Sequence, residues 1–252
     1  MKIMESGAVI FDFDGTLMDS YTEREFAHRE VSKFLSHNID KMGFKSDPKT
    51  MLDLISKIEI EMSDGREWNR NIWWKEVIKR YLGKTIKIPS SVLSDASLIY
   101  WNTIMERSTV YPGVISLLQN LKQSGFSLGL ISDTDGLKGM KSTRISHSGL
   151  SEFFNAILVA GEDTQEVKPS IKPFIKISEL LGFPPEKNIF IGDNPKTDVT
   201  GAKASGMKTI IIENTTIFFR NYVTLPDLVL KRENINDLED SIIKILNLKS
   251  IE

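Results

Sequence analysis

Short apolar runs that alternate with amphipathic helical patterns constrain the fold of this chain most. The runs occupy residues 7–12, 126–131, 156–159, 188–191 and 208–212. Each has the length and composition of a strand that is buried on both faces. Between the later runs, apolar side chains recur at helical spacing, as in residues 114–121 and 174–181. Alternating strands and helices predict an α/β fold, a Rossmann-like core with a mostly parallel sheet covered on both faces.

Two weaker patterns follow near the end of the chain. Residues 228–230 are apolar and are expected to add a short strand to the sheet. Residues 235–248 carry apolar side chains at helical spacing and are expected to form a closing helix.

Residues from about Asp19 to Arg107 follow a different pattern, with helical periodicity and no run typical of a buried strand. We therefore expect a helical cap domain of residues 19–107, inserted into an α/β core domain of residues 1–18 and 108–252. The cap segment contains all of the tryptophans, namely Trp68, Trp73, Trp74 and Trp101. Packing inside the cap is the commoner role for such side chains, and a contact with substrate is the alternative for one or two of them.

Composition excludes several kinds of chemistry. The chain has no cysteine, which rules out disulfides, thiolate nucleophiles and cysteine-bound zinc. Its formal net charge of -2 does not favour nucleic acid or an anionic membrane as a partner. Its apolar runs fall short of the roughly 20 residues that span a bilayer. Residues 1–10 lack the long apolar stretch of a signal peptide, so we expect a cytoplasmic protein.

The first apolar run ends at the carboxylate of Asp12, and a second carboxylate, Asp14, stands two residues later, directly before Gly15. Alternate side chains of a strand lie on the same face, so the two carboxylates can point together. Ligands of open α/β sheets bind beyond the carboxyl ends of the strands. Neighbouring carboxylates repel each other there unless a cation neutralises them, and Mg²⁺ prefers such hard oxygen ligands. A plain turn is the alternative for this segment taken alone, because Asp and Gly are common in turns.

Three further segments carry polar residues that suit the same site as these two carboxylates. The second apolar run ends with the hydroxyl of Ser132, and Lys168 comes just before a predicted helix. The run at 188–191 is followed by Asp193, with Asp198 five residues later. Together with the first pair of carboxylates, these segments offer a nucleophile, an acid, metal ligands and an ammonium group that binds phosphoryl oxygens. The combination predicts phosphoryl transfer.

The segment Asp12-Phe-Asp14-Gly-Thr16-Leu17 is similar to the first motif of the haloacid dehalogenase-like hydrolase superfamily. The resemblance covers residues 7–18 and about 110–215. It implies that Asp12 attacks phosphorus and that Asp14 is the acid and base. The position of the insert resembles the helical cap of phosphoglycolate phosphatase-like and β-phosphoglucomutase-like members. Members that remove a halide lack the second Asp, so Asp14 disfavours dehalogenation.

The resemblance also implies a phosphate-binding set. Ser132 matches the second-motif hydroxyl that holds a phosphoryl oxygen, and Lys168 matches the third-motif lysine. Lys172 repeats the Lys-Pro signal and is the alternative, although the spacing to the following helix favours Lys168. Asp133 stands where the family often has Asn, and we include it as a candidate phosphate-binding residue.

The metal site is implied in the same way. Asp193 matches the fourth-motif residue that binds Mg²⁺ together with the Asp12 carboxylate and the backbone carbonyl of Asp14. We expect Asp198 and Asn194 to support this site without being the predicted metal ligands.

The sequence therefore predicts a Mg²⁺-dependent phosphatase that hydrolyses a small phosphorylated metabolite, a phosphate monoester, through a phosphoaspartate on Asp12. A phosphotransferase or sugar-phosphate mutase on the same scaffold is one alternative. A non-catalytic regulatory binding protein is the other, and the presence of Asp14, Lys168 and Asp193 argues against it.

Overall fold

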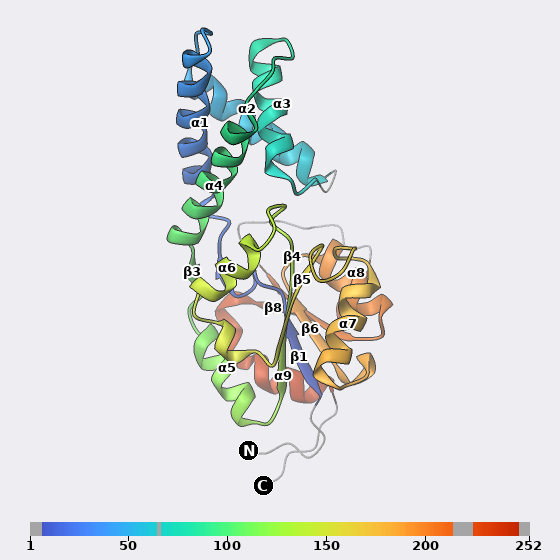
Figure 1. Ribbon diagram of the computed structural model, residues 1–252. Helices are drawn as coiled ribbons and strands as arrows, with labels where there is room; N and C mark the ends of the chain where they lie inside the picture. The colour runs from blue at the N-terminus through green and yellow to red at the C-terminus, as the bar shows by residue number, and fades with distance from the viewer. Residues whose placement is uncertain (1–6, 65–66, 214–223, 247–252) are drawn as a thin grey trace. The chain divides into compact units, whose positions relative to one another are not determined.

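The computed structural model describes residues 7–64, 67–213 and 224–246 (Figure 1). The chain forms two compact units over these residues. The core unit lies within residues 1–21, 109–134 and 141–252, and the helical unit comprises residues 22–108 and 135–140. Their boundaries fall within three residues of the expected domain limits, but the helical unit also includes the short segment 135–140. The assignment of these units as core and cap domains stays a prediction.

A parallel sheet of six strands organises the described part of the core unit (Figure 1). The order across the sheet is β5-β4-β1-β6-β7-β8, and every neighbouring pair is parallel. The strands are β1 (Ala8–Phe11), β4 (Ser127–Asp133), β5 (Ala156–Ala160), β6 (Ile189–Gly192), β7 (Lys208–Glu213) and β8 (Leu228–Lys231). This arrangement confirms the α/β fold and the strands predicted from the apolar runs, including the short one at residues 228–230.

The central strand β1 shows why these runs are continuously apolar. Alternate side chains of a strand lie on opposite faces. Val9 and Phe11 accordingly belong to one hydrophobic cluster, and Ala8 and Ile10 belong to another. Both clusters are buried, so neither face of β1 tolerates a polar side chain.

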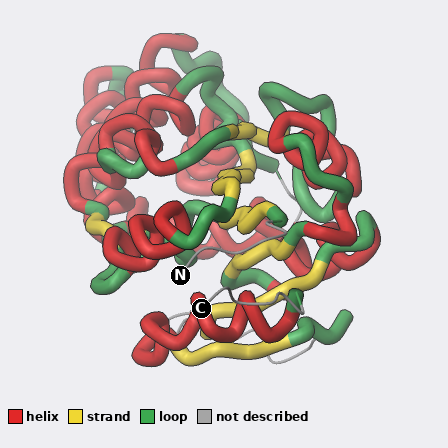
Figure 2. Tube along the Cα trace, turned by 90° about the horizontal axis from the view of Figure 1, so that it is seen from below, coloured by secondary structure: helices red, strands yellow, loops and turns green. Residues whose placement is uncertain are grey.

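Helices cover both faces of this sheet (Figure 2). On the Phe11 side lie α5 (Val114–Gln123), α6 (Met140–His147) and α9 (Leu238–Ile245). On the Ile10 side lie α7 (Ile171–Leu181) and α8 (Thr200–Ala204). Short turns of helix complete the unit: η1 (Ser151–Phe153), η2 (Pro185–Lys187), η3 (Pro195–Val199) and η4 (Arg232–Asp237).

The closing helix differs from its expected range. Residues 232–237 form the 3₁₀ segment η4, and the α-helix begins only at Leu238. Asn234 has non-helical backbone angles, which interrupts the helical pattern read from the sequence. The expected end at residues 247–248 lies outside the described residues.

The helical unit consists of α1 (Arg24–Lys41), α2 (Pro48–Asp64), α3 (Arg70–Leu82) and α4 (Ser90–Arg107). The short strands β2 (Met18–Asp19) and β3 (Thr109–Val110) pair antiparallel where the chain leaves and re-enters the core unit. Trp73 and Trp74 are fully buried in the core of the helical unit, which confirms the packing interpretation for these two side chains. Among the described residues, the helices lack the length and apolar character needed to cross a bilayer.

Candidate active site

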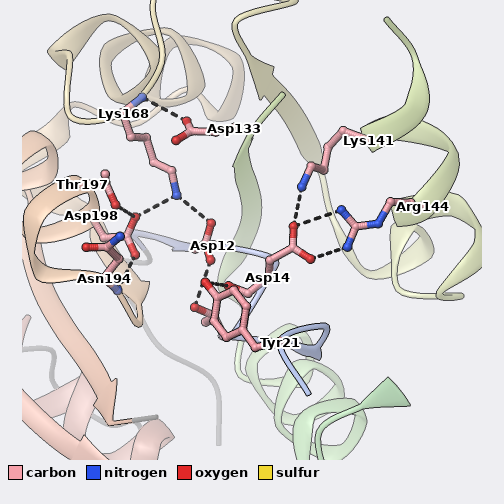
Figure 3. A network of polar contacts seen from close by, with 11 residues as sticks. Asp12, Asp14, Tyr21, Asp133, Lys141, Arg144, Lys168, Asn194, Thr197 and Asp198 are labelled. Carbon is pink, nitrogen blue, oxygen red and sulfur yellow. Dashed lines mark hydrogen bonds and ion pairs between the residues drawn. The ribbon is translucent and has the colours of Figure 1, made fainter. Parts of the chain in front are cut away.

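The carboxyl edge of β1 and its two neighbours assembles the site (Figure 3). Phe11, the last residue of β1, is in register with Leu130 of β4 and with Ile191 of β6. The segments that follow these strands therefore reach the same edge of the sheet. The backbone N–H of Asp12 donates to the carbonyl of Ile191 at 2.9 Å, which fixes the backbone of Asp12 beside β6.

The ammonium group of Lys168 lies between two carboxylates. Its Nζ is 2.6 Å from Oδ1 of Asp12 and 2.8 Å from Oδ1 of Asp198. Lys168, Asp12 and Asp198 are only 3%, 5% and 1% exposed, respectively. Burial lowers the pKa of the Lys168 ammonium, but the charges of Asp12 and Asp198 outweigh it and hold that pKa well above its usual range. The lysine is therefore a fixed positive charge at the end of β1.

Asp133 holds the Lys168 segment in place. One of its carboxylate oxygens accepts the backbone N–H of Lys168 at 3.0 Å. Burial raises the pKa of the Asp133 carboxyl, with the Lys168 charge acting in the opposite direction. The structure thus gives Asp133 a positioning contact with the neighbouring loop. Its direct role in phosphate binding stays a prediction, as does that of Ser132, which is buried near the end of β4 opposite Val159.

Asp12, Asp193 and Asp198 form a buried acidic cluster. Each offers one carboxylate oxygen, and these oxygens all lie within 4.8 Å of one another. Burial raises the pKa of Asp193 well above its usual value, and repulsion from Asp12 raises it further. Burial is also the main cause that raises the pKa of Asp12. Oδ2 of Asp193 has no hydrogen-bond partner among the described residues. A divalent cation with hard oxygen ligands fits this donor set.

Two glycines leave room for the acidic cluster. Gly15 has a φ of +81°, and a Cβ atom there would lie 2.3 Å from Oδ2 of Asp193. A Cβ atom on Gly192 would lie 2.1 Å from Oδ2 of Asp198. Side chains at these positions would collide with the carboxylates, so the cluster depends on both glycines.

Asp14 is not a member of the acidic cluster, and its carboxylate points toward Lys141 and Arg144 (Figure 3). Its carboxylate accepts hydrogen bonds from the ammonium of Lys141 and from the guanidinium of Arg144. Burial raises the pKa of Asp14, but Arg144 and Lys141 outweigh it and hold that pKa well below its usual range. The backbone carbonyl of Asp14 accepts from the hydroxyl of Tyr21 at 3.2 Å. The predicted metal ligand is this carbonyl, and that assignment stays a prediction.

Asn194 supports the site through Asp198. Its backbone N–H donates to Oδ2 of Asp198 at 3.1 Å, and its side chain accepts the backbone N–H of Lys196 at 3.0 Å. The structure also separates the two candidate lysines. Lys172 has an exposed side chain that pairs with Glu166, whereas Lys168 contacts Asp12.

Three cations near the first motif were missed by the sequence analysis. Lys141 and Arg144 are three residues apart on α6, the helix that follows β4. Residues at this spacing share one face of a helix, and this spacing is the sequence signal that could have found the pair. Arg232 donates to the backbone carbonyl of Thr16 at 2.9 Å and also to that of Gly15. No local sequence pattern predicts this contact, because more than 200 residues separate Arg232 from Gly15 and Thr16.

Comparisons with known protein families, sequences and structures all find hydrolases or phosphatases. The family model for haloacid dehalogenase-like hydrolases matches residues 9–212. The pyrophosphatase PpaX of Halalkalibacterium halodurans is 34% identical over 230 residues, covering 90% of this chain and 94% of the relative. Glyceraldehyde 3-phosphate phosphatase of Methanocaldococcus jannaschii is 27% identical over 241 residues, covering 96% and 97%. The crystal structure of a HAD phosphatase from Thermococcus onnurineus superposes with a TM-score of 0.65 at 25% identity, covering 96% and 98%.

The acidic cluster predicts how stability responds to pH and Mg²⁺. The pKa of Asp12 rises from its usual 3.8 to about 7 in the folded, metal-free protein, so the folded state binds this proton more tightly than the unfolded chain does. The resulting stabilisation is full at the lowest pH and is lost as pH rises through about 7. At pH 8, Mg²⁺ at about 100 times its dissociation constant should restore about 2.7 kcal/mol. Thermal melts followed by circular dichroism measure both effects.

Asp193→Asn isolates the contribution of the cluster. Removing one repelling carboxylate should flatten the pH dependence of the metal-free protein and weaken its response to Mg²⁺. The exposed Asp53 of α2 provides the matched control, and Asp53→Asn should behave as the unmodified protein does. An equal Mg²⁺ response in Asp193→Asn and Asp53→Asn would contradict the assignment of the cluster as a cation site.

Proposed function

The chain belongs to the haloacid dehalogenase-like hydrolase family, and from this premise we propose a Mg²⁺-dependent phosphatase that forms a phosphoaspartate on Asp12. Family membership confirms the resemblance drawn from the motifs. Curated relatives are phosphatases, so the chain is a hydrolase of phosphate compounds. The observation that carries the finer proposal is the Lys168 ammonium 2.6 Å from Asp12, beside the buried carboxylates of Asp193 and Asp198.

The charges at the site support attack by Asp12 on phosphorus. The Asp12 carboxylate accepts from Lys168 through one oxygen and from the hydroxyl of Thr16 through the other, at 3.2 Å. The Lys168 ammonium is placed to bind an oxygen of a phosphoryl group that approaches Asp12, with the Ser132 hydroxyl as the second predicted donor. Asp12, Asp193 and Asp198, with the predicted carbonyl of Asp14, would hold Mg²⁺. When bound, the ion supplies positive charge that offsets the charge on the phosphoryl oxygens.

The reaction proceeds in two displacements. In the first, an Asp12 oxygen forms a bond to phosphorus, the ester P–O bond breaks, and protonated Asp14 gives its proton to the leaving alcohol oxygen. To carry this proton, the Asp14 side chain must turn away from Lys141 and Arg144, because beside them its pKa lies well below its usual range. In the second, water attacks the phosphorus and Asp14 accepts a proton from that water. The bond between phosphorus and Asp12 then breaks and releases inorganic phosphate. The covalent intermediate replaces one difficult displacement by two easier ones.

We place the substrate among small phosphorylated metabolites. One relative is named for glyceraldehyde 3-phosphate, which is a small phosphate monoester. The phosphoryl group is common to all such esters, so selection of the alcohol must come from other groups. In this proposal the helical unit acts as the cap that contributes to the selection.

Turnover should require both the metal and Asp12. With p-nitrophenyl phosphate as a generic ester, excess chelator should abolish release of phosphate, and Mg²⁺ should restore it. Asp12→Asn should be inactive because the amide is a poor nucleophile. Asp14→Asn should lower kcat by roughly 10² to 10⁴, the usual effect of losing a general acid and base. Near-normal turnover by a folded Asp12→Asn variant would exclude the covalent mechanism.

The two lysines of the Lys-Pro pairs provide a matched comparison. Lys168→Ala should lower kcat by roughly 10² to 10³, because it removes a charge aimed at the phosphoryl oxygens. Lys172→Ala should change kcat by less than about twofold, because surface ion pairs like that with Glu166 contribute little. Circular dichroism confirms folding of each variant before assay. Equal losses in the two variants would remove Lys168 from the proposed phosphate-binding set.

A further inference from the structure

Arg232 joins the end of the chain to the first motif. This residue follows the edge strand β8 and begins η4, and it lies beyond residues 9–212, which match the family model. Nη1 of its guanidinium donates to the carbonyl of Thr16 at 2.9 Å, and Nη2 donates to the carbonyl of the preceding residue, Gly15. One planar side chain from outside the matched region therefore holds two consecutive carbonyls of the loop that follows Asp12.

The Arg232 side chain is itself held in place. Its Cζ atom lies 3.6 Å from the centroid of the Tyr111 ring. Tyr111 packs against the hydrophobic cluster that contains Phe11, and its backbone N–H donates to the carbonyl of Leu17 at 3.0 Å. A guanidinium over an aromatic face is attracted to that face and presents its donors in a fixed plane. The donors that reach the loop are therefore set by the packing of the core unit.

The loop that Arg232 holds also orients the Asp12 carboxylate. The hydroxyl of Thr16, a fully buried residue, donates to Oδ2 of Asp12 at 3.2 Å. The other oxygen, Oδ1, accepts from the Lys168 ammonium at 2.6 Å. A carboxylate with a donor on each oxygen cannot turn about its Cβ–Cγ bond without weakening one of these hydrogen bonds. The position of the Thr16 backbone therefore helps to set the direction in which the Asp12 oxygens face.

We propose that Arg232 is a positioning residue for the transfer of the phosphoryl group to Asp12. By holding the carbonyls of Gly15 and Thr16, its guanidinium keeps the Thr16 hydroxyl on the Asp12 carboxylate. The carboxylate then meets phosphorus in line with the ester bond that breaks, and a misplacement of about 1 Å can lower such a rate by about 10²-fold. The inference rests on the proposed function, because it takes Asp12 as the nucleophile.

Arg232 supplies position to the site rather than charge. Burial raises the pKa of Asp193, and the charge of Arg232 acts in the opposite direction. A positive charge beside the acidic cluster also repels a cation that binds there, so its removal should not weaken the binding of Mg²⁺. What a guanidinium adds is a planar fork that reaches two carbonyls at once, which a compact ammonium group does not offer. A loss of turnover on removal of Arg232 would therefore come from the position of the loop.

The turn has hydrogen bonds of its own that do not involve Arg232. The N–H of Gly15 donates to the carbonyl of Met18 at 2.8 Å, and the N–H groups of Leu17 and Met18 donate to the carbonyl of Phe13, each at 3.0 Å. These bonds lie within residues 13–18 and keep the local shape of the turn. Removal of the guanidinium should therefore shift the turn within the core unit without unfolding it.

Arg232→Met removes both donors and keeps an unbranched apolar side chain over Tyr111. With p-nitrophenyl phosphate and saturating Mg²⁺, kcat should fall roughly 10- to 100-fold, because Asp12 is misaligned. KM should stay within about threefold, because an interaction that acts only in the transition state lowers kcat and kcat/KM equally. Lys231, the preceding residue, has an exposed side chain, and Lys231→Met is the matched control that should keep the original kcat. Equal kcat in the two variants would overturn the inference.

Arg232→Lys separates the fork from the charge. The ammonium keeps the positive charge but presents its donors from a single atom. If the fork is what positions the loop, kcat of this variant should remain at least roughly fivefold below that of the unmodified enzyme. Full kcat in Arg232→Lys would show that charge suffices and would contradict the positioning role.

A double-mutant cycle tests whether Arg232 acts through Thr16. Thr16→Val removes the hydroxyl that orients Asp12 and keeps a side chain of similar shape. Two residues that act through one contact have effects that do not add. In the Thr16→Val background, Arg232→Met should therefore lower kcat by less than about threefold. An undiminished loss in that background would exclude action through Thr16.

Inhibition by two oxyanions gives a measurement that partial unfolding of a variant does not change. Orthovanadate can take up the five-coordinate geometry of the transition state at Asp12, whereas inorganic phosphate stays tetrahedral. At constant free Mg²⁺, Arg232→Met should raise the inhibition constant of vanadate about tenfold and leave that of phosphate within about threefold, because only the first depends on an aligned carboxylate. Unchanged constants for both oxyanions would overturn the inference.

Failure of the proposed function gives a different result. Full turnover in excess chelator, or full activity of Asp12→Asn, would overturn the proposed function and this inference with it. Normal Mg²⁺ dependence and an inactive Asp12→Asn variant, together with an Arg232→Met variant that behaves as the unmodified enzyme does, would overturn the inference alone.

Discussion

The burial of the Lys168 ammonium between Asp12 and Asp198 is the interaction on which the rest of the site depends. Charges so deeply buried are stable only when they have partners of opposite sign. Each partner comes from a different strand end: Asp12 follows β1, Lys168 lies between β5 and α7, and Asp198 lies beyond β6. Only the parallel sheet brings these segments to one edge. The fold and the charge network therefore stabilise each other.

The balance of charge at this edge explains why a divalent cation belongs there. Among the described residues, the carboxylates of Asp12, Asp193 and Asp198 surround the single ammonium of Lys168. When all are ionised, two negative charges remain. In the metal-free protein, raised pKa values let protons reduce this charge, at Asp193 and Asp12 in particular. A divalent cation neutralises the same two charges without protonating the nucleophile.

Much of the fold could be predicted because parallel strands that are buried on both faces appear in the sequence as continuous apolar runs. Residues on both faces of β1 are buried, so its apolar run is continuous and ends where the carboxylates begin. Asp12 and Asp193 could be singled out because they lie at the ends of strand runs, and Lys168 because it precedes a predicted helix. The start of the closing helix was misplaced by the helical pattern at residues 235–237, because the backbone at Asn234 departs from helical angles.

The contacts of individual side chains at the site could not be predicted in the same way. Asp133 accepts the backbone N–H of Lys168, and Arg232 donates to the carbonyl of Thr16. Both are contacts between distant parts of the chain, and such contacts follow from the tertiary arrangement rather than from local spacing. The pairing of Asp14 with Arg144 is of this kind, although the cations on α6 share a helical face.

The chemical identity of the reaction intermediate tests the assignment of Asp12 most directly. The enzyme is mixed with Mg²⁺ and a phosphate ester, quenched in acid within milliseconds, and digested for peptide mass spectrometry. The charge network around Lys168 predicts one added phosphoryl group on the peptide that contains Asp12, located on that side chain, which disappears as substrate is consumed. A phosphoryl group on another residue, or turnover with no phosphorylated peptide at any quench time, would contradict attack by Asp12.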